Sequence, residues 1–263
     1  MSLATPSFGA PVDTLAYGAW LFDMDGVLTK TALVHAAAWK QAFDEFLQRE
    51  SVATHTAFVP FDPEADYERY VDGEPREDGV RHFLAARGVV LPEGNDDVPP
   101  DARTVKGLAN RKNELVLQVI AAQGVEVYDG VKDLVVQLRA GGVKVAVVSA
   151  SENTKAALAA GGIGDLFDVI IDGHVVKNRG LAGKPAPDSY LEGARVLRVG
   201  PDRAVVIEDA LAGVEAGHAG NFGLVVGVDH HDGTADRAYA DDLLEHGATV
   251  VVRELTELLA STT

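Results

Sequence analysis

Two aspartates separated by one residue follow a short apolar run near the start of the chain. The run is Ala19–Phe22, and the next residues are Asp23, Met24, Asp25 and Gly26. An aspartate can act as a nucleophile toward phosphorus, and a second carboxyl group can donate or take up the proton of the reacting oxygen. The pattern predicts a phosphoryl-transfer centre. Taken alone, the motif has an alternative interpretation as an Asp-rich turn that closes a strand.

The charge of the chain limits what it can bind. Its formal net charge is −17 over 263 residues, and such an acidic surface repels nucleic acid and anionic lipid. We therefore expect no nucleic-acid or membrane partner. A phosphorylated substrate would be repelled as well, so a phosphate site must contain local cations.

The composition is that of a globular protein, with 47% hydrophobic and 24% charged residues. There is no cysteine, which excludes disulfides and thiolate-bound metal and makes a reducing cytoplasm the simplest expected location. Residues 1–12 lack the basic cluster and apolar run of a signal peptide. No apolar stretch approaches the roughly 20 residues that span a bilayer.

Several short apolar runs end in small or acidic residues and precede helical patterns. They are Ala19–Phe22, Val143–Val148, Val169–Ile171, Ala204–Ile207, Leu224–Val228 and Thr249–Val252. Continuous apolar strands that alternate with helices predict an α/β fold, with a parallel sheet covered on both faces. The expected crossover helices are Glu152–Ala160, Pro187–Leu197 and Ala210–Ala219. Ligands of such sheets bind beyond the carboxyl ends of the strands, and the candidate site residues of this chain are expected there.

The segment 33–122 differs because it has helical patterns and no convincing buried strand. The expected helices are Val34–Gln48, Glu64–Tyr70, Asp78–Arg87 and Thr104–Ile120. We predict an all-helical cap domain over residues 33–122, inserted after the first strand, and an α/β catalytic core made of residues 1–32 and 123–263. Hinges would lie near Lys30–Thr31 and Gln123–Gly124.

Three other groups at strand ends could complete a phosphoryl-transfer site. Ser149-Ala150-Ser151 offers a hydroxyl and backbone amides to phosphoryl oxygens, although Ser151 could instead be a helix N-cap. Lys184 precedes a proline and would stabilise transition-state charge beside acidic ligands. The pair Glu208-Asp209 offers the oxygen ligands that Mg²⁺ prefers, with an acidic helix N-terminus as the alternative.

With these motifs in this order, the chain resembles the haloacid dehalogenase superfamily, and closely its β-phosphoglucomutase-like branch. The motifs are Asp23–Thr29, Ser149–Ser151, Lys184–Asp188 and Glu208–Asp209, and the resemblance runs from Trp20 to Val252. The resemblance implies a Rossmann-like parallel-sheet core with an all-helical cap. It also implies that Asp23 is the nucleophile and Asp25 the general acid/base.

The same resemblance implies the other site residues. Mg²⁺ would be held by the Asp23 carboxylate, the Asp25 main-chain carbonyl and Asp209, with Glu208 as an additional or outer-shell ligand. Ser149, Ala150 and Lys184 would bind the phosphoryl group. The residues expected to contact the substrate, most of them in the cap, are Thr31, His35, Trp39, Arg76, Lys112, Asn113, Ser151 and Asn153.

One cap residue has a specific expected role, two share a helix face, and one position departs from the family. His35 and Trp39 share one helix face, where such residues are normally core or surface residues. By the same resemblance, Arg76 would bind the phosphate that is not being transferred, a role for which the guanidinium fork is suited. Lys30 stands where the family commonly has an acidic residue, which alters the charge at the expected hinge.

The expected function is that of a β-phosphoglucomutase, which interconverts β-glucose 1-phosphate and glucose 6-phosphate. The alternative is a sugar-phosphate phosphatase that uses the same residues with water as acceptor, and the contrasting class is a non-enzymatic sensor. Arg76, His35 and Lys112 favour the mutase, because a phosphatase needs no second phosphate site. The expected partner is a small phosphorylated sugar, and the protein is expected to be a monomer or weak dimer.

Two other patterns favour structural interpretations. Gly161–Gly164 follows a helix and not a strand, so it is not a dinucleotide-binding loop. Asp229-His230-His231-Asp232 contains metal-ligand types, but a polar loop after a strand is the favoured interpretation.

Overall fold

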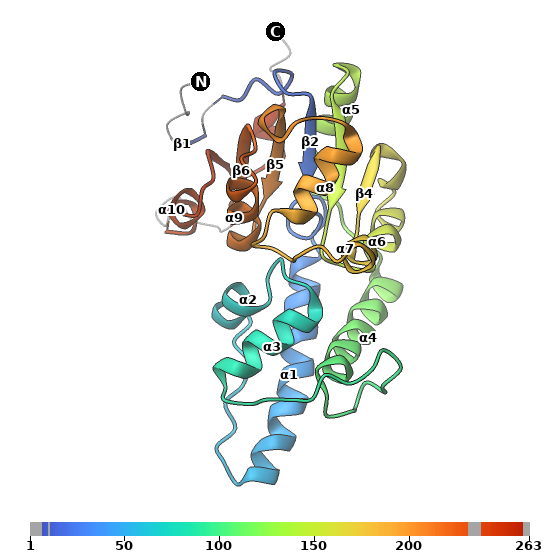
Figure 1. Cartoon of the computed structure of the whole chain (residues 1–263), viewed down its shortest axis with the longest axis vertical. Coiled ribbons are helices and arrows are strands. Elements are labelled where there is room, and N and C mark those ends of the chain that lie inside the picture. Colours follow the sequence, from blue (N-terminus) through green and yellow to red (C-terminus); the bar gives the residue numbers. More distant parts are fainter. Residues whose placement is uncertain (1–6, 10, 231–237, 260–263) are drawn as a thin grey trace. The chain divides into compact units, whose positions relative to one another are not determined.

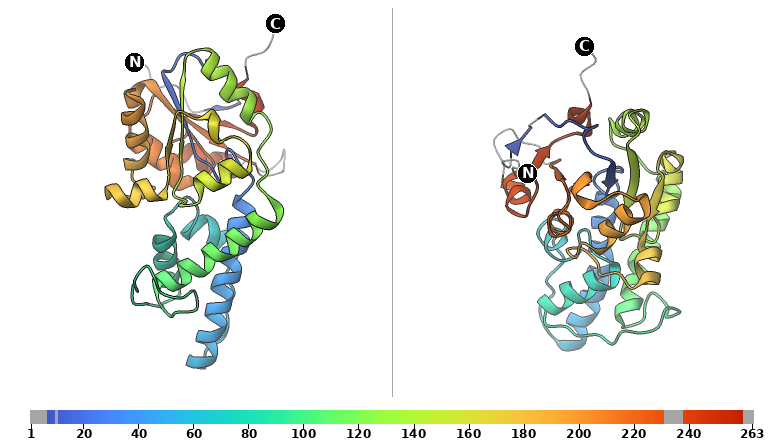
Figure 2. Two further views of the ribbon diagram at one scale, coloured as in Figure 1. Left: turned by 90° about the vertical axis from the view of Figure 1, so that its right-hand side faces the viewer. Right: turned by 45° about the horizontal axis from the view of Figure 1, so that its top comes forward.

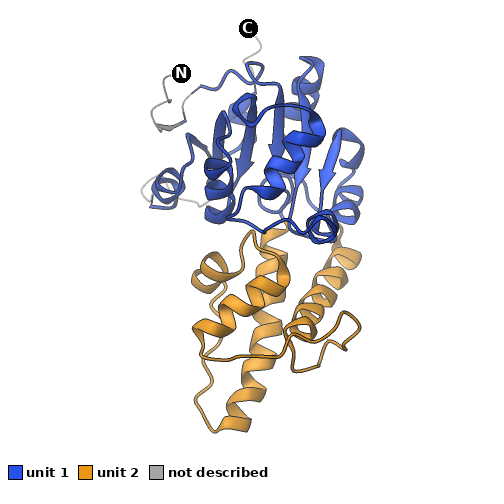
Figure 3. Cartoon of the chain, in the orientation of Figure 1, with its two compact units in different colours: residues 1–30, 125–263 blue, residues 31–124 orange. Residues whose placement is uncertain are grey.

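A computed structural model describes residues 7–9, 11–230 and 238–259. The chain divides into two compact units, one made of residues 1–30 and 125–263 and the other of residues 31–124 (Figure 3). We call these the core unit and the cap unit. The boundaries expected from the sequence, 32/33 and 122/123, lie two residues inside the cap unit.

The core unit is built on a parallel sheet with the strand order β1-β7-β6-β5-β2-β3-β4 (Figure 1). The strands are β1 (Ser7–Phe8), β2 (Ala19–Phe22), β3 (Lys144–Val148), β4 (Val169–Ile171), β5 (Ala204–Glu208), β6 (Leu224–Val228) and β7 (Val250–Val252). The two-residue strand β1 was not predicted. The cap segment therefore follows the second strand of the chain, and not the first.

The side chains of β2 alternate between two buried layers. Trp20 and Phe22 point to one face, which is covered by α5 (Val131–Ala140) and α6 (Thr154–Ala160). Ala19 and Leu21 point to the other face, which is covered by α8 (Asp188–Leu197) and α9 (Leu211–Ala219). All four strand residues are fully buried, as expected for a parallel sheet with helices on both faces (Figure 2).

The expected crossover helices α6, α8 and α9 are present, each beginning one or two residues later than predicted. Among the described residues, the core unit also contains α5, α7 (Gly173–Arg179) and α10 (Ala238–Glu245). Helices α5 and α7 were not predicted, and α10 contains the pair Asp241-Asp242, which the sequence indicates as a helix start. Short 3-10 turns occur at Gly164–Leu166, Pro201–Arg203 and Leu255–Leu258.

The register of the sheet brings three strand ends together. Phe22 is paired with Val147 of β3 and with Ile207 of β5. The chain continues from these positions to Asp23, Ser149 and Glu208, all at the carboxyl edge of the sheet. This register positions the candidate site.

The cap unit is helical, as predicted. Its helices are α1 (Ala32–Thr54), α2 (Ala65–Tyr70), α3 (Arg76–Ala86) and α4 (Val105–Gln123). Buried aromatic side chains form its core, with the rings of Phe43 and Phe83 4.2 Å apart. In the described part of the chain, no helix has both the length and the apolar character needed to cross a membrane.

Candidate active site

A tight loop carries the two aspartates away from β2. The backbone N–H of Asp23 still donates to Ile207 O at 3.0 Å, which extends the ladder with β5 by one residue. The chain then turns, and the N–H groups of Leu28 and Thr29 both donate to Met24 O at 2.9 Å. Gly26 has φ +89°, a conformation that side chains disfavour. The loop thus holds Asp23 and Asp25 at the end of a rigid strand.

Lys184 lies between two carboxylates at this edge. Its ammonium group donates to Asp23 Oδ1 at 2.5 Å and to Oε1 of Glu208. All three residues are buried, with exposed fractions of 5%, 6% and 0% for Lys184, Asp23 and Glu208. The cation required beside a phosphate site in this acidic chain is therefore present.

Burial and charge act on this group in opposite directions. Burial raises the pKa of Asp23 well above its ordinary value, and the nearby Glu208 and Asp25 add to the rise, although Lys184 opposes it. Burial alone would lower the pKa of Lys184, but the charges of Asp23 and Glu208 raise it above its ordinary value. Lys184 is therefore a fixed positive charge at neutral pH.

Glu208 is engaged with protein groups through both carboxylate oxygens. Oε1 accepts from Lys184 and from the hydroxyl of Tyr190 at 2.7 Å, and Oε2 accepts from the N–H of Ala210 at 3.2 Å. This arrangement favours the outer-shell role over direct metal binding. Tyr190, at 0% exposure on α8, was missed from the sequence because a buried aromatic in a helix looks like an ordinary core residue.

The carboxylates of Asp23, Glu208 and Asp209 form a group that could hold a metal ion, since one oxygen of each lies within 4.8 Å of the others. Oxygen donors of this kind suit Mg²⁺. Asp209 also lies against the backbone of Gly26, where an added Cβ would meet its Oδ2 at 1.7 Å. Only glycine fits there, so the position of the Asp209 carboxylate depends on the loop that carries Asp23 and Asp25.

The loop after β3 brings Ser149 to the same edge. Its N–H donates to Ile171 O at 2.9 Å, and its Oγ accepts from the N–H of Ser151 at 3.1 Å. The N-cap of α6 is Asn153, so the alternative that Ser151 is the N-cap is wrong. Instead, Ser151 Oγ accepts from the N–H of Asn153 at 3.2 Å. Ala150 lies between the two serines in this loop.

In the cap unit, three predicted residues from two helices meet. Lys112 of α4 donates to Nδ1 of His35 of α1 at 2.9 Å, and its ammonium group lies 5.0 Å from the centre of the Trp39 ring. Trp39 is 3% exposed and stacks on Phe43 at 4.9 Å. It is therefore a core residue that supports Lys112 and is not exposed to a ligand.

The other predicted cap residues lie at helix ends or beside Lys112. Thr31 occupies the N-cap position of α1 and is buried, without a capping bond from its side chain. Arg76 is the first residue of α3. Asn113 follows Lys112 on α4 and is partly exposed.

Lys30 and His230 flank the loop of residues 23–29. Lys30 pairs with Glu126 through its side chain and lies 5.6 Å from the ring centre of Tyr128. Burial, aided by the charges of Asp209 and Glu126, raises the pKa of Tyr128 to about 12. His230 Nε2 donates to Gly26 O at 2.7 Å. The sequence interpretation as a polar loop missed this contact, and His231 and Asp232 lie outside the described residues.

Comparisons with known proteins identify the family of the chain. The pattern of the haloacid dehalogenase-like hydrolases matches residues 17–221. The chain belongs to this family. It is 49% identical over 241 residues to the β-phosphoglucomutase of Mycobacterium tuberculosis, covering 92% of this chain and 91% of that protein. These similarities place it in the β-phosphoglucomutase-like branch of the family.

Solved structures of haloacid dehalogenase-like proteins share the fold. The β-phosphoglucomutase of Clostridium difficile has a TM-score of 0.72 at 24% identity and covers 92% of this chain and 93% of its own. CbbY from Rhodobacter sphaeroides, in complex with phosphate, has a TM-score of 0.66 at 23% identity and covers 92% of this chain and 96% of its own. At these identities the likeness supports the α/β core and helical cap.

Proposed function

We propose that this haloacid dehalogenase-family enzyme is a β-phosphoglucomutase, which interconverts β-glucose 1-phosphate and glucose 6-phosphate. The observation that carries phosphoryl transfer is the buried Lys184 held between Asp23 and Glu208. The choice of sugar follows the M. tuberculosis relative, which bears this name and is 49% identical along nearly the whole chain.

In the proposed reaction, Asp23 alternates between a free carboxylate and an aspartyl phosphate. A carboxylate oxygen of Asp23 attacks a phosphorus of β-glucose 1,6-bisphosphate, and the bond from that phosphorus to the sugar oxygen breaks. Asp25 gives its proton to the departing sugar oxygen. In the reverse direction, a sugar hydroxyl attacks the aspartyl phosphate, and Asp25 takes the proton.

Binding of phosphate beside so many acids requires local positive charge. Lys184 supplies a fixed cation whose partners are Asp23 and Glu208. We infer that Mg²⁺ binds to Asp23, Asp209 and the carbonyl of Asp25, where it would offset the repulsion between carboxylate and phosphate. Ser149 and the amide of Ala150 would accommodate the phosphoryl oxygens.

The cap residues carry the part of the proposal that separates a mutase from a phosphatase. A mutase must hold a second phosphate while the first is transferred, and Arg76 is the proposed ligand for it. Lys112, which is hydrogen-bonded to His35, is a further candidate cation for this second phosphate beside Arg76.

The deciding experiment follows β-glucose 1-phosphate by ³¹P NMR, with Mg²⁺ and a trace of the 1,6-bisphosphate. We expect glucose 6-phosphate as the main product and little inorganic phosphate. Release of inorganic phosphate as the main product would replace the mutase with the sugar-phosphate phosphatase. A run with Asp23→Asn is the control for background conversion.

A further inference from the structure

A hydrogen bond from His230 holds the loop of residues 23–29 at its glycine, Gly26. Gly26 joins two peptide groups, and its missing Cβ leaves their relative orientation free. The N–H of Gly26 donates to Thr29 O at 2.9 Å, so the first peptide group is held from within the loop. The carbonyl of the second accepts a 2.7 Å hydrogen bond from His230, which follows β6.

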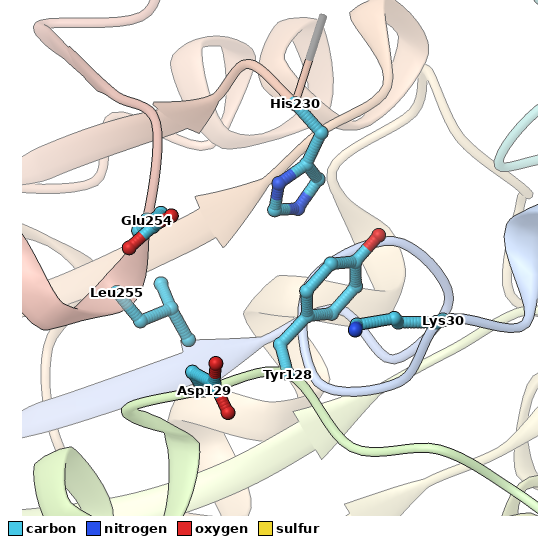
Figure 4. A pocket seen from close by; sticks show the side chains of 6 residues that line it. All are labelled: Lys30, Tyr128, Asp129, His230, Glu254 and Leu255. Carbon is cyan, nitrogen blue, oxygen red and sulfur yellow. The ribbon is translucent and has the colours of Figure 1, made fainter. Parts of the chain in front are cut away.

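His230 is itself held by an aromatic partner. Its ring stacks on Tyr128 with centres 4.1 Å apart and planes at 1°. Figure 4 shows the two rings face to face, with Lys30 beside Tyr128. The backbone N–H of Tyr128 donates to Leu28 O at 3.1 Å. The histidine is therefore positioned by a residue that is already tied to the same loop.

The loop cannot restrain Gly26 with a side chain of its own. An added Cβ at Gly26 would lie 1.7 Å from Asp209 Oδ2, so the space is taken by a proposed metal ligand. A shift of Gly26 would move the carbonyl of Asp25 on one side and the contact with Asp209 on the other. A restraint on the Gly26 carbonyl thus acts on both.

We propose that His230 is a positioning residue for the Mg²⁺ site. Stacked on Tyr128, it fixes the orientation of the Gly26 carbonyl by its hydrogen bond. In this role it acts through the Gly26 backbone and not on the reacting atoms. The proposal rests on the phosphoryl-transfer site proposed above, but it makes no assumption about the sugar. Partners behind metal ligands commonly change metal affinity or activity by roughly 10–100-fold when they are removed.

Two variants separate the hydrogen bond from the stack. His230→Phe keeps a ring on Tyr128 and loses the donor, whereas His230→Gln keeps an N–H near the position of Nε2 and loses the ring. The two rings line an open pocket of about 170 Å³, so both replacements fit without repacking a closed core. His246→Phe is the matched control, because His246 also donates to a backbone carbonyl, that of Asp242 at 2.7 Å, away from the site.

The test measures Mg²⁺ binding by calorimetry and amide hydrogen exchange in the metal-free protein. We expect His230→Phe to raise the Mg²⁺ Kd roughly tenfold and to speed exchange over residues 24–29 several-fold. His230→Gln should stay within about threefold of wild type in Kd, and His246→Phe should be unchanged.

Equal Mg²⁺ affinity and exchange in His230→Phe and wild type would overturn the proposal. It would also be overturned if His230→Gln lost as much affinity as His230→Phe, because the donor would then not be what matters. Neither measurement uses a sugar. If glucose 6-phosphate did not form but the variants kept the expected order, the mutase proposal would fall and the positioning role of His230 would stand.

Discussion

The hydroxyl of Tyr190 donates a 2.7 Å hydrogen bond to Oε1 of Glu208, the oxygen that Lys184 also contacts. Burial, together with the charges of Glu208 and Asp23, raises the pKa of Tyr190 well above its ordinary value, so the tyrosine remains a donor at neutral pH. One buried carboxylate oxygen is thus shared by a phenol and an ammonium group.

Tyr190→Phe removes this donor and leaves the ring in place. A buried hydrogen bond to a charged group contributes about 1.5–3 kcal/mol, so we expect the free energy of unfolding in urea to fall by about that amount. Activity should fall less than tenfold, since Lys184 still contacts Asp23. Tyr70→Phe, at a partly buried tyrosine of the cap, is the control. A stability equal to wild type would show that the hydrogen bond is not formed in solution.

Asp25→Asn tests the general acid. Proton transfer contributes about 10²–10⁴-fold, so mutase turnover should fall by that factor. An aryl phosphate has a leaving group that needs little protonation, and its initial burst on mixing with enzyme should survive. Stopped-flow absorbance measures the burst, and Asp241→Asn on the exposed side of α10 is the control. Loss of the burst together with turnover would instead indicate a damaged nucleophile.

Gly26→Ala should abolish the Mg²⁺ response. The new Cβ would collide with the Asp209 carboxylate, which lies 1.7 Å from its position. Gly142→Ala is a matched control, because Gly142 also has positive φ, +78°, with no atom within 4 Å of the added Cβ. Both variants carry the strain of an alanine at positive φ, but only Gly26→Ala also displaces a residue of the site. Calorimetric Mg²⁺ titration of both separates the collision from the strain.

Arg76→Ala tests the second phosphate site. Loss of a charge-assisted contact to phosphate should lower kcat/KM for mutase turnover roughly 100-fold. An aryl phosphate carries a single phosphate and needs no distal site, so kcat/KM for its hydrolysis should change little. Arg49→Ala, an exposed arginine on α1, controls for the loss of cap charge. If kcat/KM fell equally in both reactions, the assignment of Arg76 as a ligand of the second phosphate would be wrong.

Asp172→Asn tests a pH-dependent contribution to stability. Oδ1 of Asp172 accepts from Val175 N–H at 2.9 Å, and Oδ2 lies 2.9 Å from Lys155 Nζ. Burial alone would raise the pKa of Asp172, but these two partners lower it below its ordinary value of 3.8. The stabilisation is therefore present above pH about 4 and is lost as pH falls through the folded-state pKa.

We expect Asp172→Asn to unfold about 1 kcal/mol more easily than wild type at pH 7. The difference should be constant down to pH about 5 and should shrink below pH about 4. Urea unfolding at pH 7, 5 and 3.5 measures it, with the exposed Asp165→Asn as the control. A difference that persists undiminished at low pH would mean that charge is not its source.

The sheet was largely predictable because its strands are continuous apolar runs. The predicted strand at Val169–Ile171 matches β4, and Ala19–Phe22 matches β2. Helix α5 was missed, because the interpretation relied on strand ends and motifs. The two-residue β1 is too short to give a pattern, and its pairing with β7 joins distant parts of the chain.

Asp23, Ser149 and the pair Glu208-Asp209 were predictable because each lies at the end of a strand, whereas Lys184, expected at a strand end, lies between α7 and α8. Tyr190 and His230 were not predictable, since their contacts depend on tertiary distance and not on spacing. Tyr190 meets Glu208 across 18 positions, and His230 meets Gly26 across 204. No local pattern distinguishes such residues from a core aromatic or a loop histidine.

The central place of β2 in the sheet has a consequence for synthesis. Its neighbours are β3 and β5, whereas the cap unit is one continuous segment, residues 31–124. On the ribosome, the cap segment is complete before either neighbour of β2 has been made. Asp23 is thus among the first site residues to emerge, but it meets Lys184 and Glu208 only after translation has passed residue 208.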